Sequence, residues 1–362
     1  MLDHITIKGF KSIASIENLE LRPINILIGA NGSGKSNFID AFSFLREVRE
    51  ARLQDYVITA SGADRVLHFG SKTTKEIFFD LSFANKTDQY YLKLSPTEDD
   101  GLFPSVEIAH HLNIASALPQ RERGLEAGIS TPRLEFSNAR WVQSQLGGWR
   151  VYHVHDTSLS SPMRKTAKVN ANEFLRPFGS NLAAFLYYLR EKHQDSYSMI
   201  LRTIQQVAPF FKDFSLKPLK LRPDDIKLEW QHKHSDEYFD VSSFSDGTLR
   251  FIFLATLFLQ PESDRPSIIL VDEPELGLHP YAIGLLASLI RQASVNTQVI
   301  VSTQSSLLLD YFEPEDVLVA DLVEYGTQIT RPDPTRLAKW LADYSLGQLW
   351  EKNELGGRPS KD

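Results

Sequence analysis

The residues with the most recognisable chemistry are Gly29–Ser36, which read Gly-Ala-Asn-Gly-Ser-Gly-Lys-Ser. Their spacing matches G-x-x-x-x-G-K-[ST], the loop that binds nucleotide phosphates. The glycines let successive backbone N–H groups turn toward one anion, and a helix beginning at the loop adds its positive end. In such a loop, Lys35 holds the β and γ phosphates and the Ser36 hydroxyl binds Mg²⁺.

A pair of acids completes this chemistry. The apolar run Ile268–Val271 predicts a buried strand, and Asp272 and Glu273 follow it directly. An acid at such a strand end can hold Mg²⁺ through its water shell, which is the role expected of Asp272. Glu273 would then face the γ-phosphate and polarise the attacking water.

A third motif lies between these two. Ser245-Asp246-Gly247-Thr248 opens an apolar helix that continues to Phe258. Ser245 reads as a helix N-cap and Gly247 as a turn residue. A serine and a glycine at a helix N-terminus also form a small anion site, and both interpretations are compatible.

The surrounding pattern predicts the elements that position these motifs. Residues 24–28 read as a strand before the loop, and Phe38, Ile39, Phe42 and Leu45 predict one face of a helix after it. Residues 172–212 have helical spacing and predict a lobe of two or three helices. Residues 96–132 contain Pro, Gly and charges and are predicted to be rich in loops. The remaining predictions are a strand at 5–7, a hairpin at 76–83 and 90–94, strands at 133–137, 226–230, 299–302 and 317–320, and a helix at 281–292.

Composition limits the class of protein. The chain has 362 residues, of which 42% are hydrophobic, and it has no cysteine, which excludes disulfides and thiolate metal sites. Its net charge of −7 argues against a surface that coats nucleic acid as a whole. The N-terminus lacks the pattern of a signal peptide, and the longest apolar stretch, 251–259, is too short for a bilayer. We therefore expect a cytoplasmic protein with no membrane partner.

Taken in order, Gly29–Ser36, Ser245–Thr248, Asp272-Glu273-Pro274 and Ser302-Thr303-Gln304-Ser305 resemble the ABC-type ATPase heads of the SMC/RecF/OLD group. The resemblance covers nearly the whole chain. It implies an α/β fold, an ABC-type P-loop NTPase head with a β-rich ATP-binding lobe and an inserted helical lobe. On this basis we expect an N-terminal ATP-binding lobe at 1–150, the helical lobe with strands at 151–240, and a C-terminal lobe with tail at 241–362.

The resemblance also implies roles for individual residues. ATP and Mg²⁺ are the expected cofactors, with Ser36 and Asp272 at the metal and Glu273, Lys35 and Gln304 in catalysis. Ser245 and Gly247 would contact the ATP of a second subunit, so that ATP is held between two heads of a homodimer. The remaining expected nucleotide contacts are Lys11, which ends the opening strand, and Asn31, Gly32, Ser33, Gly34 and Asn37.

Two departures from the group stand out. The switch strand of the group usually ends in His, whereas this chain has Gln304, which can hydrogen-bond but cannot carry a proton. No glutamine marks a Q-loop, and His153, His155 and Asp156 stand where one is expected. The two histidines would share one face of a strand, as metal ligands might, but polar surface or nucleotide-edge positions are favoured because no further ligands stand out.

The implied function is Mg-ATP binding, ATP-driven dimerisation and slow hydrolysis, in DNA repair, recombination or phage defence with a separate effector such as a nuclease. The alternative is an ATP-gated regulatory scaffold that scarcely hydrolyses ATP and does not bind DNA; a transporter ATPase is disfavoured. Only 58 residues follow Gln304, too few for a nuclease domain. Arg164, Lys165 and Lys168 form a basic cluster that is either a solvated face or a DNA contact. The tail at 346–359 could dock on its own core or on a partner, or form a surface helix with a frayed end.

Overall fold

The computed structural model describes residues 1–111, 114–117, 126–130, 137–324 and 326–357. The chain forms two compact units, one made of Met1–Val151 with Glu313–Asp362 and the other of Tyr152–Phe312. These units divide the chain at 151/152 and at 312/313, so residues after 312 belong with the N-terminal lobe. The expected boundary at 240/241 lies inside the second unit.

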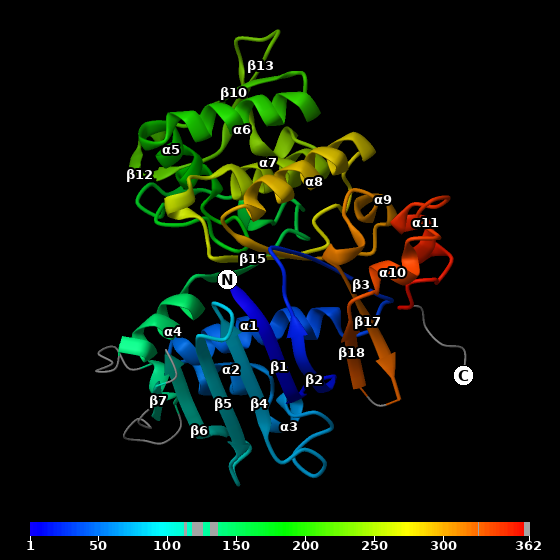
Figure 1. The fold of residues 1–362 in the computed structure, drawn as a ribbon. Coiled ribbons are helices and arrows are strands. Elements are labelled where there is room, and N and C mark those ends of the chain that lie inside the picture. Colours follow the sequence, from blue (N-terminus) through cyan, green and yellow to red (C-terminus); the bar gives the residue numbers. More distant parts are fainter. Residues whose placement is uncertain (112–113, 118–125, 131–136, 325, 358–362) are drawn as a thin grey trace. The chain divides into compact units, whose positions relative to one another are not determined.

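The first unit contains an antiparallel sheet with the strand order β2-β1-β4-β5-β6-β7. The helix α1 (Lys35–Arg49) packs on it, with Phe44 against Phe10 of β1 and Phe79 of β4 (Figure 1). The predicted apolar face of α1 is confirmed, because Phe38, Ile39, Phe42 and Leu45 are all buried. The strands are β1 (Leu2–Phe10), β2 (Ile13–Glu20), β4 (Ile77–Phe83), β5 (Asp88–Pro96), β6 (Leu102–His111) and β7 (Ile114–Ala117).

The prediction that residues 96–132 are rich in loops was wrong for the described part of that segment. The strand β6 pairs with β5 along its whole length, and β7 pairs with β6. Pro104 and Glu107 gave the segment its loop-like composition. The strand accommodates Pro104 where the register with β5 shifts, and Glu107 is buried, where it accepts hydrogen bonds from Tyr90 Oη (2.7 Å) and from backbone N–H groups.

The phosphate-loop strand, β3 (Ile24–Ile28), belongs to a second layer of the first unit. It pairs in parallel with β17 (Val317–Val323), which pairs antiparallel with β18 (Gly326–Thr330). The remaining elements of this unit are α2 (Leu53–Thr59), α3 (Ala63–Val66), α4 (Ser137–Gly147), α10 (Pro334–Leu337) and α11 (Leu346–Glu351). The strand predicted at 133–137 falls mostly outside the described residues, and its last residue, Ser137, begins α4. The strand β8 (Trp149–His153) carries the chain into the second unit.

In the second unit, the predicted helical lobe is confirmed as α5 (Leu182–Lys192) and α6 (Gln194–Val207). The helix α7 (Asp246–Leu259) is buried over nearly its whole length and contacts α6 and α8 (Pro280–Ser294). The parallel strands β15 (Ile268–Asp272) and β16 (Gln298–Ser302) carry the chain to its second group of motifs, and α9 (Ser306–Leu309) follows them. None of the described helices combines the length and apolar character needed to cross a bilayer.

Two small antiparallel sheets complete the second unit. One has the order β11-β12-β9 and the other β10-β13-β14. The single strand predicted at 226–230 was wrong, because β12 ends at Ile226, β13 begins at Glu229, and the two lie in different sheets. The alternating apolar residues that suggested one strand, Ile226, Leu228 and Trp230, are nevertheless all buried. The strands are β9 (Ala167–Lys168), β10 (Phe211–Ser215), β11 (Pro218–Leu219), β12 (Arg222–Ile226), β13 (Glu229–His232) and β14 (Tyr238–Asp240).

Candidate nucleotide site

The phosphate loop lies in the first unit, between β3 and α1. Gly34 is the N-cap of α1 with φ +94°, in the left-handed region. A Cβ at Gly34 would overlap the Thr327 hydroxyl, and one at Gly29 would overlap the Ala320 carbonyl oxygen. The loop therefore needs glycine at both positions, at Gly34 for its backbone conformation as well as for space.

The interior of the loop fits a phosphate group. The Lys35 ammonium is buried and donates to the carbonyl oxygens of Gly29 (2.8 Å) and Ala30 (2.9 Å). The Ser33 hydroxyl is buried without a hydrogen-bond partner among the described residues. A Cβ at Gly32 would meet no atom within 4 Å, so the loop is open there. A buried cation, an unsatisfied hydroxyl and open space together match an anionic ligand. Asn31 and Ser36 are exposed beside them.

Asn37 and Ser12 tie the loop to the opening strands. The Asn37 amide donates to Ser12 Oγ (2.7 Å), and Ser12 Oγ lies 2.8 Å from Thr327 Oγ1. The Thr327 backbone N–H donates to the Ser12 carbonyl (2.8 Å). Asn37 therefore holds the turn after β1 in place, and Ser12 and Thr327 are positioning residues that the motif alone did not indicate.

Lys11 lies at the rim of a hollow of about 680 Å³ in the first unit, together with Asn37, Arg65 and Phe69. The Lys11 ammonium pairs with Asp40 at 2.5 Å. The Phe69 ring is 63% exposed and lies against the His68 ring, with 4.3 Å between centroids. The sequence analysis did not identify Arg65 and Phe69. The available signal was Phe69, an aromatic residue directly before Gly70.

The C-terminal segment reaches the start of the phosphate loop. The Ala30 N–H donates to the Gly357 carbonyl at 2.7 Å, and the Gly357 N–H donates to Asp321 Oδ2 at 3.1 Å. Gly357 has φ +83°, and a Cβ there would lie 3.3 Å from Gly29 Cα. Of the alternatives for the tail, docking on its own core is the one observed for the described residues, and Leu346 and Leu349 of α11 are buried.

The two acids at the end of β15, of which Asp272 is its last residue and Glu273 follows it, lie in the second unit. Asp272 is paired in register with Ser302 of β16, and His155 Nε2 lies 3.7 Å from Asp272 Oδ2. Burial favours the protonated acid, but the nearby His155 ring and Ser302 hydroxyl outweigh it and lower the pKa of Asp272. The same contact with Asp272 raises the pKa of His155. An ionised carboxylate at this strand end fits a Mg²⁺ ligand.

Glu273 and Gln304, predicted separately to act in hydrolysis, lie in direct contact. The Gln304 amide donates to the Glu273 carboxylate. Glu273 has φ +43°, and its backbone N–H donates to the Ser302 carbonyl at 2.8 Å. A left-handed conformation at a residue other than glycine is strained, and such strain concentrates at functional positions.

Ser245 caps α7, as its motif predicted. Its hydroxyl accepts from the Thr248 N–H at 3.2 Å. A Cβ at Gly247 would overlap the Gly277 carbonyl oxygen, so the start of α7 packs directly on the turn after β15. Ser245 and Gly247 therefore have structural roles, and their contact with a nucleotide stays a prediction.

The interpretation of Arg164 as a DNA contact was wrong for this conformation. The Arg164 side chain is only 5% exposed and donates to the carbonyl oxygens of Val241 (2.7 Å) and Phe244 (3.3 Å) and to the Asp246 carboxylate (3.0 Å). It holds the segment before α7 in place. Lys168 pairs with Asp225 at 2.7 Å, whereas Lys165 is exposed.

His153 and His155 do not share a strand face, because β8 ends at His153. The His153 ring stacks on Phe178 (5.3 Å between centroids, 20° between planes), and His155 turns to Asp272. Arg250 of α7 fixes this segment by donating to the carbonyl oxygens of Val154 (2.9 Å) and His155 (3.1 Å). Among the described residues, no group of three or more His, Cys, Asp and Glu could hold a metal ion by itself.

Comparison with known proteins places this chain among ATPase heads. A family described as "AAA domain, putative AbiEii toxin, Type IV TA system" matches residues 24–310. No curated protein sequence matches the chain. Solved structures give the same fold, since an Smc head bound to the C-terminal winged-helix domain of ScpA matches with a TM-score of 0.61 and 15% identity, over 93% of this chain and 99% of that one.

Two further structures agree. The Smc head of Pyrococcus furiosus with an extended coiled coil, bound to the C-terminal domain of ScpA, matches with a TM-score of 0.57 and 14% identity over 94% of this chain and 98% of that one. The Smc head of Pyrococcus yayanosii with a coiled coil and joint gives a TM-score of 0.53 and 13% identity over 94% and 99%. The expected α/β ABC-type head fold is thereby confirmed.

Proposed function

The chain belongs to this family of AAA domains, and on that premise we propose that it binds Mg-ATP at the phosphate loop and hydrolyses it slowly. The observation that carries the proposal is the interior of the loop. There, a buried lysine ammonium donates to loop carbonyls, a buried serine hydroxyl lacks a partner among the described residues, and Gly32 leaves open space. Each of these features gains a partner when a phosphate enters.

The proposed roles follow from the chemistry of each group. Lys35 exchanges the carbonyls of Gly29 and Ala30 for phosphate oxygens, and Ser36 and Asp272 hold the metal. Bound Mg²⁺ neutralises charge that develops on the phosphate oxygens. Glu273 orients and polarises the attacking water, and Gln304 passes from the Glu273 carboxylate to the γ-phosphate or the water.

The nucleoside is proposed to lie in the hollow beside α1. Phe69 offers an exposed ring face for stacking of the base, and Lys11 and Arg65 are cations near the sugar and phosphates. A Phe69→Ala protein is expected to bind ATP about fivefold more weakly, which corresponds to about 1 kcal/mol of lost stacking.

The first experiment tests the loop. We expect Lys35→Ala to abolish calorimetric ATP binding while the circular dichroism spectrum stays native. The control is Lys192→Ala, an exposed lysine of α5 in the second unit. Unchanged ATP affinity in Lys35→Ala would remove the site from the loop.

We further propose that ATP joins two heads into a dimer, in which Ser245 and Gly247 of one chain face the nucleotide of the other. Glu273→Gln is expected to accumulate a dimer with Mg-ATP, and Ser245→Arg in the same chain to prevent it. Light scattering with and without Mg-ATP measures this. A double mutant that dimerises as well as Glu273→Gln alone would exclude the trans contact.

A partner protein is proposed as the receiver of the ATP signal, because two of the similar heads were solved bound to domains of ScpA. A second candidate receiver is DNA, in repair, recombination or phage defence. Of the basic cluster Arg164, Lys165 and Lys168, only Lys165 has no ion pair among the described residues and could contact DNA. Filter binding with an ATP analogue at low salt tests it, since phosphate contacts weaken steeply with salt.

The contact between Gln304 and Glu273 favours a second candidate function. Gln304 cannot carry a proton, and its amide occupies one oxygen of the Glu273 carboxylate, which reduces the capacity of that carboxylate to accept from water. A scaffold that binds ATP to gate a partner and scarcely hydrolyses it would have this arrangement. Turnover per head, measured with and without DNA, separates the scaffold from the ATPase.

A further inference from the structure

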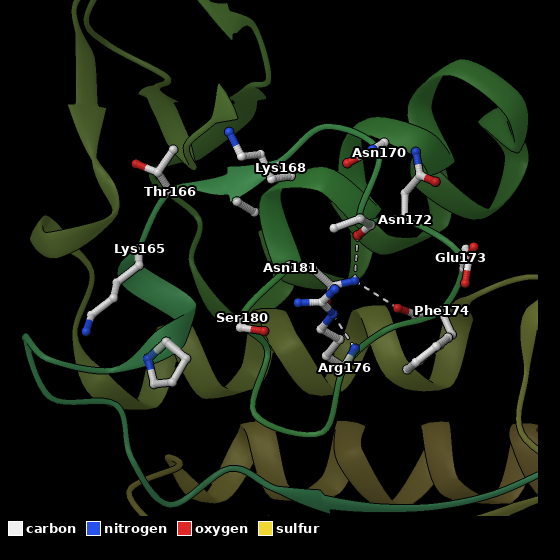
Figure 2. A pocket seen from close by; sticks show the side chains of 13 residues that line it. Lys165, Thr166, Lys168, Asn170, Asn172, Glu173, Phe174, Arg176, Ser180 and Asn181 are labelled. Atoms are coloured by element: carbon white, nitrogen blue, oxygen red, sulfur yellow. Dashed lines mark hydrogen bonds between the residues drawn. The ribbon is translucent and has the colours of Figure 1, made fainter. Parts of the chain in front are cut away.

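A hollow of about 550 Å³ lies in the second unit, and none of the residues proposed above to act on ATP lines it. One continuous segment, from Pro162 to Asn181, lines it. Asn181 at the start of α5 holds this segment in shape, because its buried amide donates to the carbonyls of Ala171 and Phe174 (both 2.8 Å) and accepts from the Arg176 N–H (2.9 Å). Figure 2 shows these three hydrogen bonds among the residues that line the hollow. The hollow is therefore a built feature of the fold.

The charges around the hollow are unevenly paired. Lys168 is neutralised by Asp225 at 2.7 Å. Lys165 and Arg176 are both exposed, and neither forms an ion pair or a side-chain hydrogen bond with any residue that the structure describes. Glu173 lies on the opposite side of the hollow from Lys165 (Figure 2). Two exposed cations without an ion pair among the described residues thus line the hollow, together with one carboxylate on the side opposite Lys165.

From this arrangement we propose that the hollow binds a nucleoside monophosphate unit, either as a free nucleotide or as the 5′ end of a nucleic acid strand. A phosphate monoester carries between −1.5 and −2 charges at neutral pH, which matches the two unpaired cations. The Arg176 guanidinium can donate two parallel hydrogen bonds to phosphate oxygens, while Lys165 adds a point charge. Thr166 and Ser180 also line the hollow and can add hydroxyl donors.

The rest of the hollow suits the nucleoside. Its volume lies in the range of about 300–1,000 Å³ that is usual for small-molecule sites. Phe174 supplies an aromatic ring, and Glu173 can accept hydrogen bonds from ribose hydroxyls or a base amino group. A longer polyphosphate would bring further negative charge toward Glu173, so the monophosphate is the better match.

The hollow is also connected to the start of α7. Lys165 directly follows Arg164, whose guanidinium holds the carbonyls of Val241 and Phe244. A ligand that contacts Lys165 would therefore lie next in the chain to Arg164, the residue that anchors the segment before Ser245.

The test is made on the full chain with the Lys35→Ala substitution, so that the phosphate loop does not contribute. The probes are 5′-AMP, a 5′-phosphorylated oligothymidylate and the same oligonucleotide without its phosphate, each measured by calorimetry. The pocket variant adds Lys165→Ala and Arg176→Ala, and the matched control adds Lys192→Ala, which removes a surface cation of the same unit. Melting temperatures verify that each variant is folded.

We expect 5′-AMP to bind the Lys35→Ala chain once, the pocket variant to bind at least tenfold more weakly, and the control to be unchanged. Binding of the phosphorylated oligonucleotide as well assigns the site to strand ends, and binding of AMP alone assigns it to free nucleotides. No binding of either phosphorylated probe, equal binding by the pocket variant and the control, or equal binding of the oligonucleotide without phosphate overturns the proposal. Because each result is a difference between two folded variants, it stands whether or not Lys35 binds ATP.

Discussion

In the phosphate loop, backbone conformation fixes the site, whereas at the end of β15 the functional side chains hold one another. Gly29 and Gly34 leave no space for a side chain; Ser12 and Thr327 lie together beside Gly34, and Gly357 lies beside Gly29. Beyond β15, Gln304 bonds to Glu273 and His155 to Asp272. Ligand binding at the loop requires only Lys35 to change partners, while hydrolysis requires several side chains to do so. Under the proposed function, the loop is preorganised for binding, and the end of β15 controls when hydrolysis can occur.

The largest expected effect concerns the end of β15. Glu273→Gln should slow ATP hydrolysis by about 10²- to 10⁴-fold, the usual contribution of a general base, and leave ATP affinity unchanged. Steady-state phosphate release and calorimetry measure the two quantities. The matched control is Glu275→Gln, because Glu275 is a buried acid two residues away that accepts from Thr303. Equal loss of hydrolysis in both variants would contradict a specific role for Glu273.

The next effect tests the rigidity of the loop. Gly34→Ala should cost about 2–3 kcal/mol of unfolding free energy and abolish ATP binding, because its Cβ overlaps the Thr327 hydroxyl at a left-handed position. Gly32→Ala should cost only about 1 kcal/mol, since Gly32 has a positive φ but open space around it. Urea titrations compare the two. Equal costs would mean that backbone strain alone governs the loop.

A smaller effect is expected at the tail. Gly357→Ala should weaken ATP binding about fivefold, or about 1 kcal/mol, because strain at φ +83° loosens the Gly357 carbonyl from the Ala30 N–H. The rate of hydrolysis at saturating ATP should be unchanged in Gly357→Ala. A substitution at the loop would then alter affinity, whereas one at the end of β15 alters the rate. The control is Glu351→Ala, an exposed residue at the end of α11. An unchanged dissociation constant in Gly357→Ala would show that the tail does not support the loop.

The smallest effect is a pH dependence of stability without Mg²⁺. The pKa of His155 is raised in the folded protein, so His155 stabilises the fold fully at pH values below its pKa in the unfolded chain, near 6.5. This stabilisation is lost as the pH rises through the higher pKa of the folded state. The pKa of Asp272 is lowered in the folded protein, so Asp272 stabilises the fold at pH values above about 3.8, and this stabilisation is lost as the pH falls further. Glu273 supports the charged histidine, and Arg250 opposes it. His155→Gln should therefore lower the melting temperature most between pH 4 and 6.5, with a difference that shrinks toward pH 8.

The sequence was most informative where one motif determines both local structure and chemistry. The loop, its flanking strand and helix, the cap at Ser245 and the acids after β15 could all be predicted, because each depends on neighbours along the chain. Ser12, Thr327 and Gly357 could not be predicted, because they reach the loop from positions far away in the sequence.

The errors have related physical reasons. The strand β6 was missed because its unusual residues, Pro104 and Glu107, are tolerated only through a register shift and buried hydrogen bonds. Arg164 was interpreted as a surface cation because its carbonyl partners lie about 80 residues away. Charge clusters in a sequence do not reveal which members are buried.

The close approach of Gly247 to the Gly277 carbonyl joins two turns that lie 30 residues apart in the chain. No side chain fits between them, so neither turn can move toward the other without displacing it. A push imposed from outside the chain on the start of α7 would therefore be passed to the turn after β15, and the reverse, without any intervening side-chain rearrangement.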